Sequence, residues 1–240
     1  MDTQPNLITK VASSTWFVTL MSTMIGVVAG FYLTDFNEKR KLNQGKKAAI
    51  EKVSQELESN HKQIAKLSDS LKIYYPQIEY VLTKVDGKSL EIIIDKDSLD
   101  SFVQKSRKVF TFFEAKSLNA REIDVSGTFE FNLVSNFIMS DLSHIVWDTY
   151  KQSHFTTITA FDCLIDVEVI YNAQKNVNAS NKEWAEALFQ LSATQSNEEV
   201  VAAFRIFMEK WKNLMLKQDL LLSMYKHNRD YSKRFRMEIL

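Results

Sequence analysis

One run of residues without a formal charge constrains this chain more than any other feature. It extends over 11–34, twenty-four residues, whereas 25% of the whole chain is charged. A transmembrane helix needs about 20 mostly apolar residues to cross a hydrocarbon core of roughly 30 Å. The Ser and Thr hydroxyls in the run can donate to the preceding helical turn, which makes them tolerable in lipid. The run therefore predicts one transmembrane helix near the N-terminus.

Two other structures also contain long apolar runs. The first, a buried helix of a soluble domain, rarely needs so many consecutive residues without a charge. The second, a cleaved signal peptide, has an apolar region of roughly 7–15 residues after a positively charged start, and here only Lys10 precedes a longer run. Trp16 and Tyr32 lie near the two ends of the run, where aromatic rings favour the lipid headgroups. We interpret the run as an uncleaved membrane anchor.

Basic residues near the two ends of the run predict its orientation. One lysine, Lys10, precedes the run, and five basic residues follow it closely: Lys39, Arg40, Lys41, Lys46 and Lys47. Because Lys and Arg near a span favour the cytoplasmic side, we expect residues 1–10 outside and residues 35–240 in the cytoplasm. The same five side chains are expected to contact anionic lipid headgroups.

Composition indicates the cellular compartment and the kinds of binding partner. The only cysteine, Cys163, cannot form an internal disulfide, which agrees with a reducing compartment. The formal net charge is zero, so no overall electrostatic field indicates binding to nucleic acid. The expected partners are the lipid bilayer, a second copy of the chain and a protein of unknown identity.

Small residues recur at four-residue spacing within the expected span. They are Ser22, Gly26 and Gly30, and this spacing places them on one stripe of a helix. Such stripes allow a second backbone to approach closely in a membrane. We therefore predict that the span self-associates through this stripe, although small residues are also common in spans by chance.

A heptad repeat follows the expected span. Ten of its eleven seam positions between Ile50 and Val85 are apolar, and Asn60 is the exception. A seam of this length predicts a coiled coil between chains or a long packing against a later helix of the same chain. A lone polar seam residue often sets register and partner number. The seam residues expected to take part in oligomerisation are Ile50, Val53, Leu57, Asn60, Ile64, Leu67 and Leu71.

Two residues are expected to interrupt this helix. Gly45 weakens it by up to about 1 kcal/mol relative to Ala. Pro76 lacks an N–H group and crowds the preceding turn, so we expect a kink or an end near Tyr75. The predicted organisation is a juxtamembrane helix over 35–85 and a helical cytoplasmic domain over 86–240.

The expected domain is mainly α-helical. Asp86-Gly87 marks a turn, and a short strand or a buried extended segment follows over 90–94. We expect irregular structure over 114–131 and a polar loop over 178–181. The expected helices span 97–113, 133–150, 157–177 and 182–191, with a last one from Ser196.

No motif in the sequence indicates catalysis. The four histidines, His61, His144, His154 and His227, lack a metal-binding spacing. Cys163 is more typical of a packed core than of a nucleophile with a positioned base. Asp162 and Asp166 share a helical face but lack a third ligand at a suitable spacing. We predict no catalytic, cofactor-binding or metal-binding residues.

Several segments resemble an uncharacterised bacterial family of proteins with one N-terminal span. The span exit, Asn37-Glu38-Lys39-Arg40-Lys41, is similar to that family's exit, although Phe36 stands where a Trp is common. Three later segments are also similar: Glu56-Leu57-Glu58-Ser59-Asn60, Trp147-Asp148-Thr149 and Tyr171-Asn172-Ala173-Gln174. The family's function is unknown, so the resemblance implies an architecture and a bacterial inner membrane, but no activity.

Three functions are compatible with these features. The leading hypothesis is a non-enzymatic, membrane-anchored scaffold or adaptor that oligomerises and binds a protein partner. The second is a signal transducer that passes a helix movement to the cytoplasmic domain. The third is an enzyme acting on lipid headgroups, which would need Asp162, Asp166, His144 or His154 to converge.

Overall fold

The computed structural model describes residues 15–85, 91–129, 141–193 and 197–237. The expected tail 1–10, the start of the expected span, the turn at Asp86-Gly87 and most of the helical stripe before residue 141 lie outside these ranges. The described chain is mainly α-helical, as predicted. Contacts divide it into two units, Met1–Glu51 and Lys52–Glu238, which are described separately. The second unit begins well before the sequence-based boundary at residue 86.

The first long helix, α2, spans Thr15–Leu82 and contains Pro76. The expected end near Tyr75 is therefore wrong. A proline inside a helix costs about 3 kcal/mol, but buried residues flank it on both sides. Leu71, Ile78 and Val81 are at most 2% exposed. Because most helix stability in a protein comes from tertiary packing, burial of this face maintains the helix through the proline.

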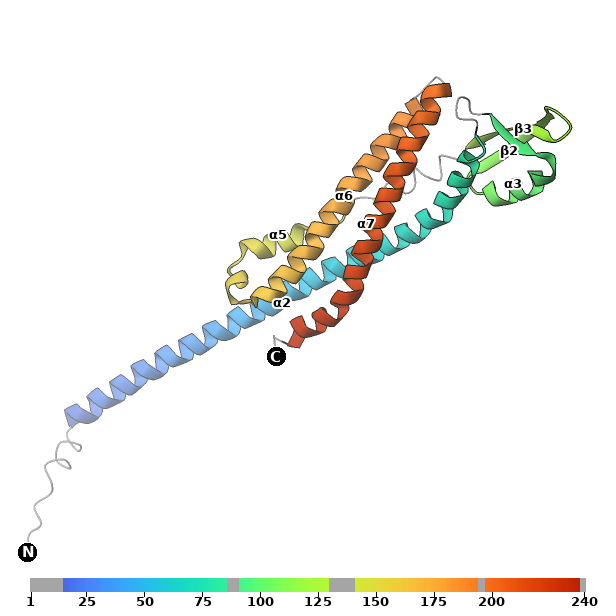
Figure 1. Ribbon diagram of the computed structural model, residues 1–240. Helices are drawn as coiled ribbons and strands as arrows, with labels where there is room; N and C mark the ends of the chain where they lie inside the picture. The colour runs from blue at the N-terminus through green and yellow to red at the C-terminus, as the bar shows by residue number, and fades with distance from the viewer. Residues whose placement is uncertain (1–14, 86–90, 130–140, 194–196, 238–240) are drawn as a thin grey trace, which may run out of the picture. The chain divides into compact units, whose positions relative to one another are not determined.

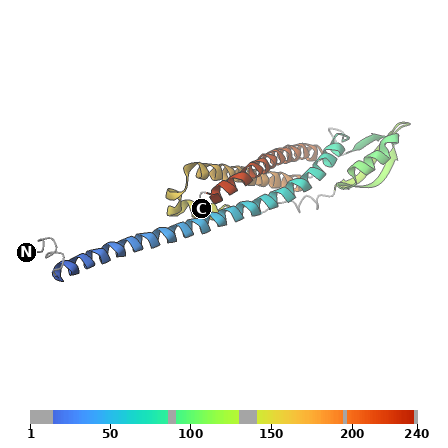
Figure 2. The same ribbon diagram turned by 90° about the horizontal axis from the view of Figure 1, so that it is seen from below.

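Helices α6 (Phe161–Ala193) and α7 (Asn197–Met237) lie side by side and pack on α2 within the second unit (Figures 1 and 2). The expected loop over 178–181 and the separate helices around it are wrong, because α6 is continuous through this stretch. Asn178, Ser180 and Asn181 are buried there. Their polarity suggests a loop, but tertiary contacts hold them inside a helix.

The second unit also contains an antiparallel sheet in the order β1-β3-β2, with β1 at Ile92–Asp95, β2 at Phe110–Ser117 and β3 at Glu122–Phe129. Strand β1 confirms the extended structure expected near 90–94. The helix expected over 97–113 is wrong in its second half, because α3 covers only Leu99–Ser106. The irregular structure expected over 114–131 is also wrong where β2 and β3 lie.

Gly127 explains why β2 and β3 pack closely. A Cβ atom at this position would collide with the ring of Phe110 and the carbonyl oxygen of Thr111. Phe110 is buried with Phe102 of α3, and the ring centroids lie 5.7 Å apart. A strand glycine often marks such a close approach. This contact joins the sheet to the hydrophobic core.

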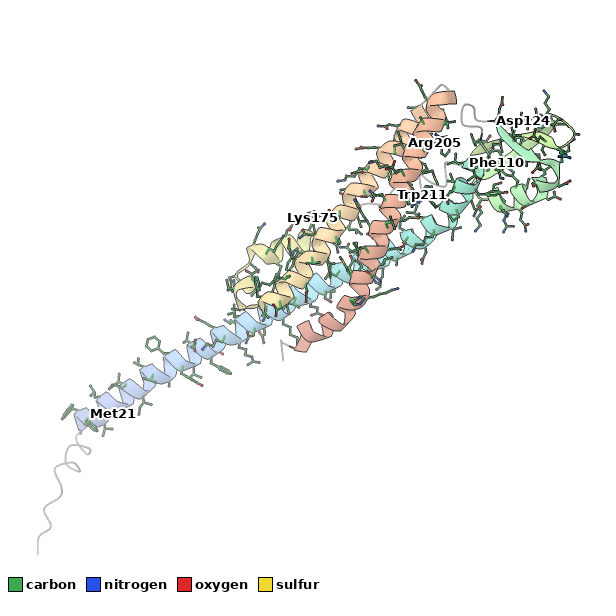
Figure 3. All side chains as sticks on the ribbon, viewed as in Figure 1. Met21, Phe110, Asp124, Lys175, Arg205 and Trp211 are labelled. Carbon is green, nitrogen blue, oxygen red and sulfur yellow. The ribbon has the colours of Figure 1, made fainter. Side chains whose placement is uncertain are left out.

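Aromatic side chains form the centre of the helical core. The Trp211 ring on α7 lies 5.7 Å from the Tyr75 ring on α2 and 5.7 Å from the Trp184 ring on α6. Figure 3 shows Trp211 on α7, with Lys175 and Arg205 labelled on α6 and α7. Edge-to-face contacts of this kind add about 0.5–1.5 kcal/mol each beyond burial. They fix how the three helices meet.

Candidate functional site: a polar cluster around Glu56 and Asn60

The N-terminal part of α2 contains one segment long and apolar enough to cross a membrane, and none of that segment is buried. Trp16 and Tyr32 are exposed near its ends. The hydroxyls of Thr19, Ser22 and Thr23 bond to carbonyls of the preceding turn, as expected for lipid. Figure 3 shows the side chain of Met21 projecting outward from this helix.

The small-residue stripe lies open on this segment. Ser22, Gly26 and Gly30 are exposed. A Cβ atom built at Gly26 or Gly30 meets nothing within 4 Å. The described part of the chain therefore gives these glycines no internal packing role, and their pairing with a neighbouring span stays a prediction.

The basic residues after the span are on the helix surface. Lys39 forms an ion pair of 2.7 Å with Asp35, one turn earlier. This hydrogen bond raises the pKa of Lys39. Arg40, Lys41 and Lys47 are exposed and Lys46 is half-buried. Their contact with lipid headgroups stays a prediction.

The heptad seam packs against other helices of the same chain. Val53, Asn60, Ile64 and Leu71 are at most 3% exposed. Leu57 and Leu67 are half-buried and pack against the core formed with α6 and α7. Ile50 belongs to the first unit, so it is not part of this packing. Of the two interpretations that the sequence allows, packing against later helices of the same chain is the one observed here.

Two asparagines hold the non-helical backbone segment 141–144 between α2 and α6. The Asn60 side chain donates to the Ser143 carbonyl at 2.7 Å and accepts from the Ser143 amide at 3.1 Å. Asn178 does the same for the carbonyl and amide of Leu142, at 3.1 and 2.9 Å. Each amide side chain thus satisfies both backbone groups of one residue, as a neighbouring strand would. Of the helix expected over 133–150, only 141–150 lies in the described residues, and there residues 141–144 are not helical and α5 begins at Ile145.

Glu56 caps the helix that follows this segment. Helix α5 spans Ile145–Gln152, and its N-cap residue makes no side-chain cap hydrogen bond. Glu56 accepts hydrogen bonds from the amide of Val146 at 3.1 Å and from the hydroxyl of Ser143 at 2.6 Å. A carboxylate at a helix N-terminus satisfies free N–H groups and complements the helix dipole. The cap comes from α2, ninety positions earlier.

Tyrosines and a glutamine complete the cluster. Tyr171 donates to Glu56 at 2.6 Å, and the Gln174 amide donates to the Tyr225 hydroxyl at 2.6 Å. Burial raises the pKa of both Tyr171 and Tyr225, and for Tyr171 the hydrogen bond to Glu56 raises it further. Both phenols therefore remain neutral donors and acceptors. The cluster joins α2, α5, α6 and α7 through satisfied polar groups.

A charged rim surrounds the cluster. The Trp147 ring stacks between Tyr150 and Tyr171, and its indole N–H donates to Glu168 at 2.6 Å. Hydrogen bonds from His144 and then Lys151 lower the pKa of Asp148. The charged side chains of this rim therefore contact one another and Trp147 around α5.

The residues considered for catalysis do not form a joint site. Within the described ranges, no group of three or more His, Cys, Asp and Glu side chains is arranged to hold a metal ion. His144 pairs with Asp148, and His227 contacts the Ser223 carbonyl of its own helix. The His61 ring packs on Tyr225 and the His154 ring on Phe155. Cys163 and Asp166 are half-buried and Asp162 is exposed.

The sequence did not predict the roles of Glu56, Tyr171, Gln174 and Asn178. One signal was nevertheless present: the later segments that resemble the bacterial family contribute Glu56 and Asn60, Trp147, and Tyr171 and Gln174. These residues are far apart in the chain and meet in one cluster. Comparison of the chain with protein families, curated proteins and solved structures finds no match. The family resemblance therefore stays a prediction.

Proposed function

We propose that this protein is a membrane-anchored, non-enzymatic scaffold or adaptor. The observation that carries the proposal is the pairing of an apolar, unburied segment at the start of α2 with a compact helical unit from Lys52 onward. In a bilayer, lipid would cover the apolar side chains that the described chain leaves exposed.

The polar cluster supports a structural role for Glu56, the most buried charged residue among those that the structure describes. Glu56 is held by Tyr171, Ser143 and the Val146 amide. A general base needs a free acceptor pointed at a substrate proton, whereas this carboxylate stabilises the junction of four helices. We propose accordingly that the unit presents a surface and performs no reaction.

In this proposal the chains associate through the span, at Ser22, Gly26 and Gly30. The part of the heptad seam from Leu57 to Leu71 is not part of the proposed contact between chains, because its apolar residues pack in the core with the chain's own α6 and α7. The basic flank supports an orientation with residues 35–240 in the cytoplasm, and the family resemblance supports a bacterial inner membrane as the proposed location.

A protein partner is proposed to bind an apolar stripe on α6. Phe161, Ile165 and Val169 follow four-residue spacing and are exposed, Phe161 by 73%. Exposed apolar residues at helical spacing are typical of helix-in-groove recognition. A photo-crosslinking amino acid at Ile165 should capture a protein, whereas the same group at Lys175, exposed elsewhere on α6, should not. Capture of lipid at Ile165 would contradict this part of the proposal.

Membrane attachment and orientation form the main test. The full chain should remain with membranes after washing at high salt or alkaline pH and should leave them only in detergent. A cysteine introduced at Lys96 should stay unlabelled by an impermeant maleimide in intact cells, with Cys163 replaced by Ser. Release of the chain by salt alone would overturn the anchor, and labelling from outside would overturn the orientation.

A further inference from the structure

Strand β2 forms an edge of the sheet. In the described residues it pairs with β3 on one side, and no described strand lies on its other side. The Leu118 amide donates to the Glu122 carbonyl at 3.1 Å, so the backbone groups of Leu118, Lys116 and Glu114 face β3. Because these groups alternate along a strand, those of Ala115 and Ser117 face the open edge.

The side chains along this edge combine exposed apolar groups with a pair of opposite charges. Phe113 and Leu118, at either end of the open stretch, are 65% and 51% exposed. Between them stand Glu114 and Lys116, which carry opposite charges two positions apart. Protected edges commonly carry lysines that repel a second strand, whereas a charge pair of this spacing can complement its own copy.

Two antiparallel copies can be centred on one of the three middle residues of the open stretch, Glu114, Ala115 or Lys116. Centring on Glu114 or on Lys116 places like charges directly opposite each other, which is unfavourable. Centring on Ala115 places each Glu114 opposite the partner's Lys116. It also makes the Ala115 pair a hydrogen-bonded pair, which is what its outward-facing backbone groups require.

We infer that β2 is a homodimerisation edge, on which a second copy of this chain pairs antiparallel with Ala115 at the two-fold axis. Each Phe113 then lies opposite the partner's Ser117, and the two sheets continue as one. The irregularity in register between Phe112 and Glu114 limits the pairing to about the 113–117 stretch. So short an interface is weak, and it gains from the proposed anchoring because shared attachment to one membrane raises effective concentration.

Disulfide crosslinking of the full chain in lipid vesicles tests the register, with Cys163 replaced by Ser. In a hydrogen-bonded pair the Cα atoms are about 5.5 Å apart, within disulfide reach. Ala115→Cys should therefore give a covalent dimer. Ser117→Cys should not, because its two copies would be separated by about four residues, roughly 13 Å. Dimers at Ser117→Cys alone, or at neither position, would overturn the inference.

Charge exchange tests the complementarity in the Ala115→Cys background. Glu114→Lys should abolish the covalent dimer, and Glu114→Lys with Lys116→Glu should restore it. Glu183→Lys is the matched control, because it reverses an exposed charge paired with Lys210 and should leave the dimer intact. Failure of the exchanged pair to restore a dimer, in a chain that still fractionates with membranes, would refute this edge while leaving the proposed anchoring in place.

Discussion

Tyr171 on α6 donates a hydrogen bond of 2.6 Å to Glu56 on α2, across 115 positions of sequence. Burial and this bond raise the pKa of Tyr171 above its ordinary value of 10.0. The folded chain therefore holds the phenol proton at a pH where the unfolded chain releases it. The stability from this group is complete below about pH 10 and is lost as pH rises further.

We expect the free energy of unfolding to fall above pH 10, with about 1.4 kcal/mol per pH unit from Tyr171. Tyr171→Phe should make this slope shallower, although it should also lower stability at neutral pH by about 1–3 kcal/mol because Glu56 loses a donor. Urea unfolding of the full chain in detergent between pH 8 and 11 measures both effects. An unchanged slope in Tyr171→Phe would contradict the buried, neutral phenol.

Asn60→Leu distinguishes two roles for Asn60: holding the backbone of Ser143 within the chain, and setting the register of a seam between chains. If Asn60 mainly holds Ser143, the substitution leaves a buried amide and carbonyl without partners and lowers stability by about 2 kcal/mol or more. Asn172→Leu, on the exposed side of α6, should change stability by less than about 0.5 kcal/mol. A change in oligomer number with undiminished stability would instead indicate a seam between chains.

Gln218 and Ser68 form a polar layer in the core. Contacts of His61 with Tyr225 and of Tyr75 with Trp211 set the register of α2 against α7, and this register places Ser68 level with Gln218. Both are 0% exposed. Their side-chain polar atoms have no hydrogen-bond partner among the described residues.

Gln218→Leu combined with Ser68→Ala should therefore raise the free energy of unfolding by about 1–3 kcal/mol, since unsatisfied buried polar groups are costly. The same unfolding assay measures it, with Ser70→Ala on the outer side of α2 as the control. A loss of stability would show that this layer is satisfied in solution, for instance by buried water.

The double substitution Gly26→Ile with Gly30→Ile tests whether the spans associate through the small-residue stripe. The open space around both glycines means that the added side chains disturb no described contact. We expect crosslinking between spans, through a cysteine at Val27, to be lost while thermal unfolding of the unit from Lys52 onward is unchanged. Persistent crosslinking would show that the spans associate through another face, and absence of crosslinking in the chain with both glycines intact would show that they do not associate through this stripe.

Pro76→Ala tests whether packing alone holds α2 together. Restoring the N–H group and removing the clash of the proline ring with the preceding turn should stabilise the helix by up to about 3 kcal/mol. A loss of stability in the unfolding assay would instead show that the proline's local geometry is needed for the contact between Tyr75 and Trp211.

Sequence patterns correctly predicted the long helical segments. The described part of the uncharged run, the heptad from Ile50 and the last helix from near Ser196 all appear as helix. An apolar stripe of period 3.6 specifies a buried helical face in the last two, whereas the uncharged run was predicted from its length and composition. Local signals failed where tertiary contacts outweighed them. The polar stretch 178–181 is helical since Asn178 bonds Leu142, and Phe110 to Phe112 lie in a strand because β3 pairs with them.

No sequence pattern predicted the polar cluster around Glu56 and Asn60. The sequence by itself determined that the chain is mainly helical, with an apolar segment fit for a membrane, since both properties arise from the spacing and composition of neighbouring residues. Only the tertiary structure decided that the seam of α2 faces its own chain and that Glu56, Asn60, Tyr171 and Asn178 meet. Their hydrogen bonds join residues more than thirty positions apart, and no local pattern records which distant partner satisfies a buried polar group.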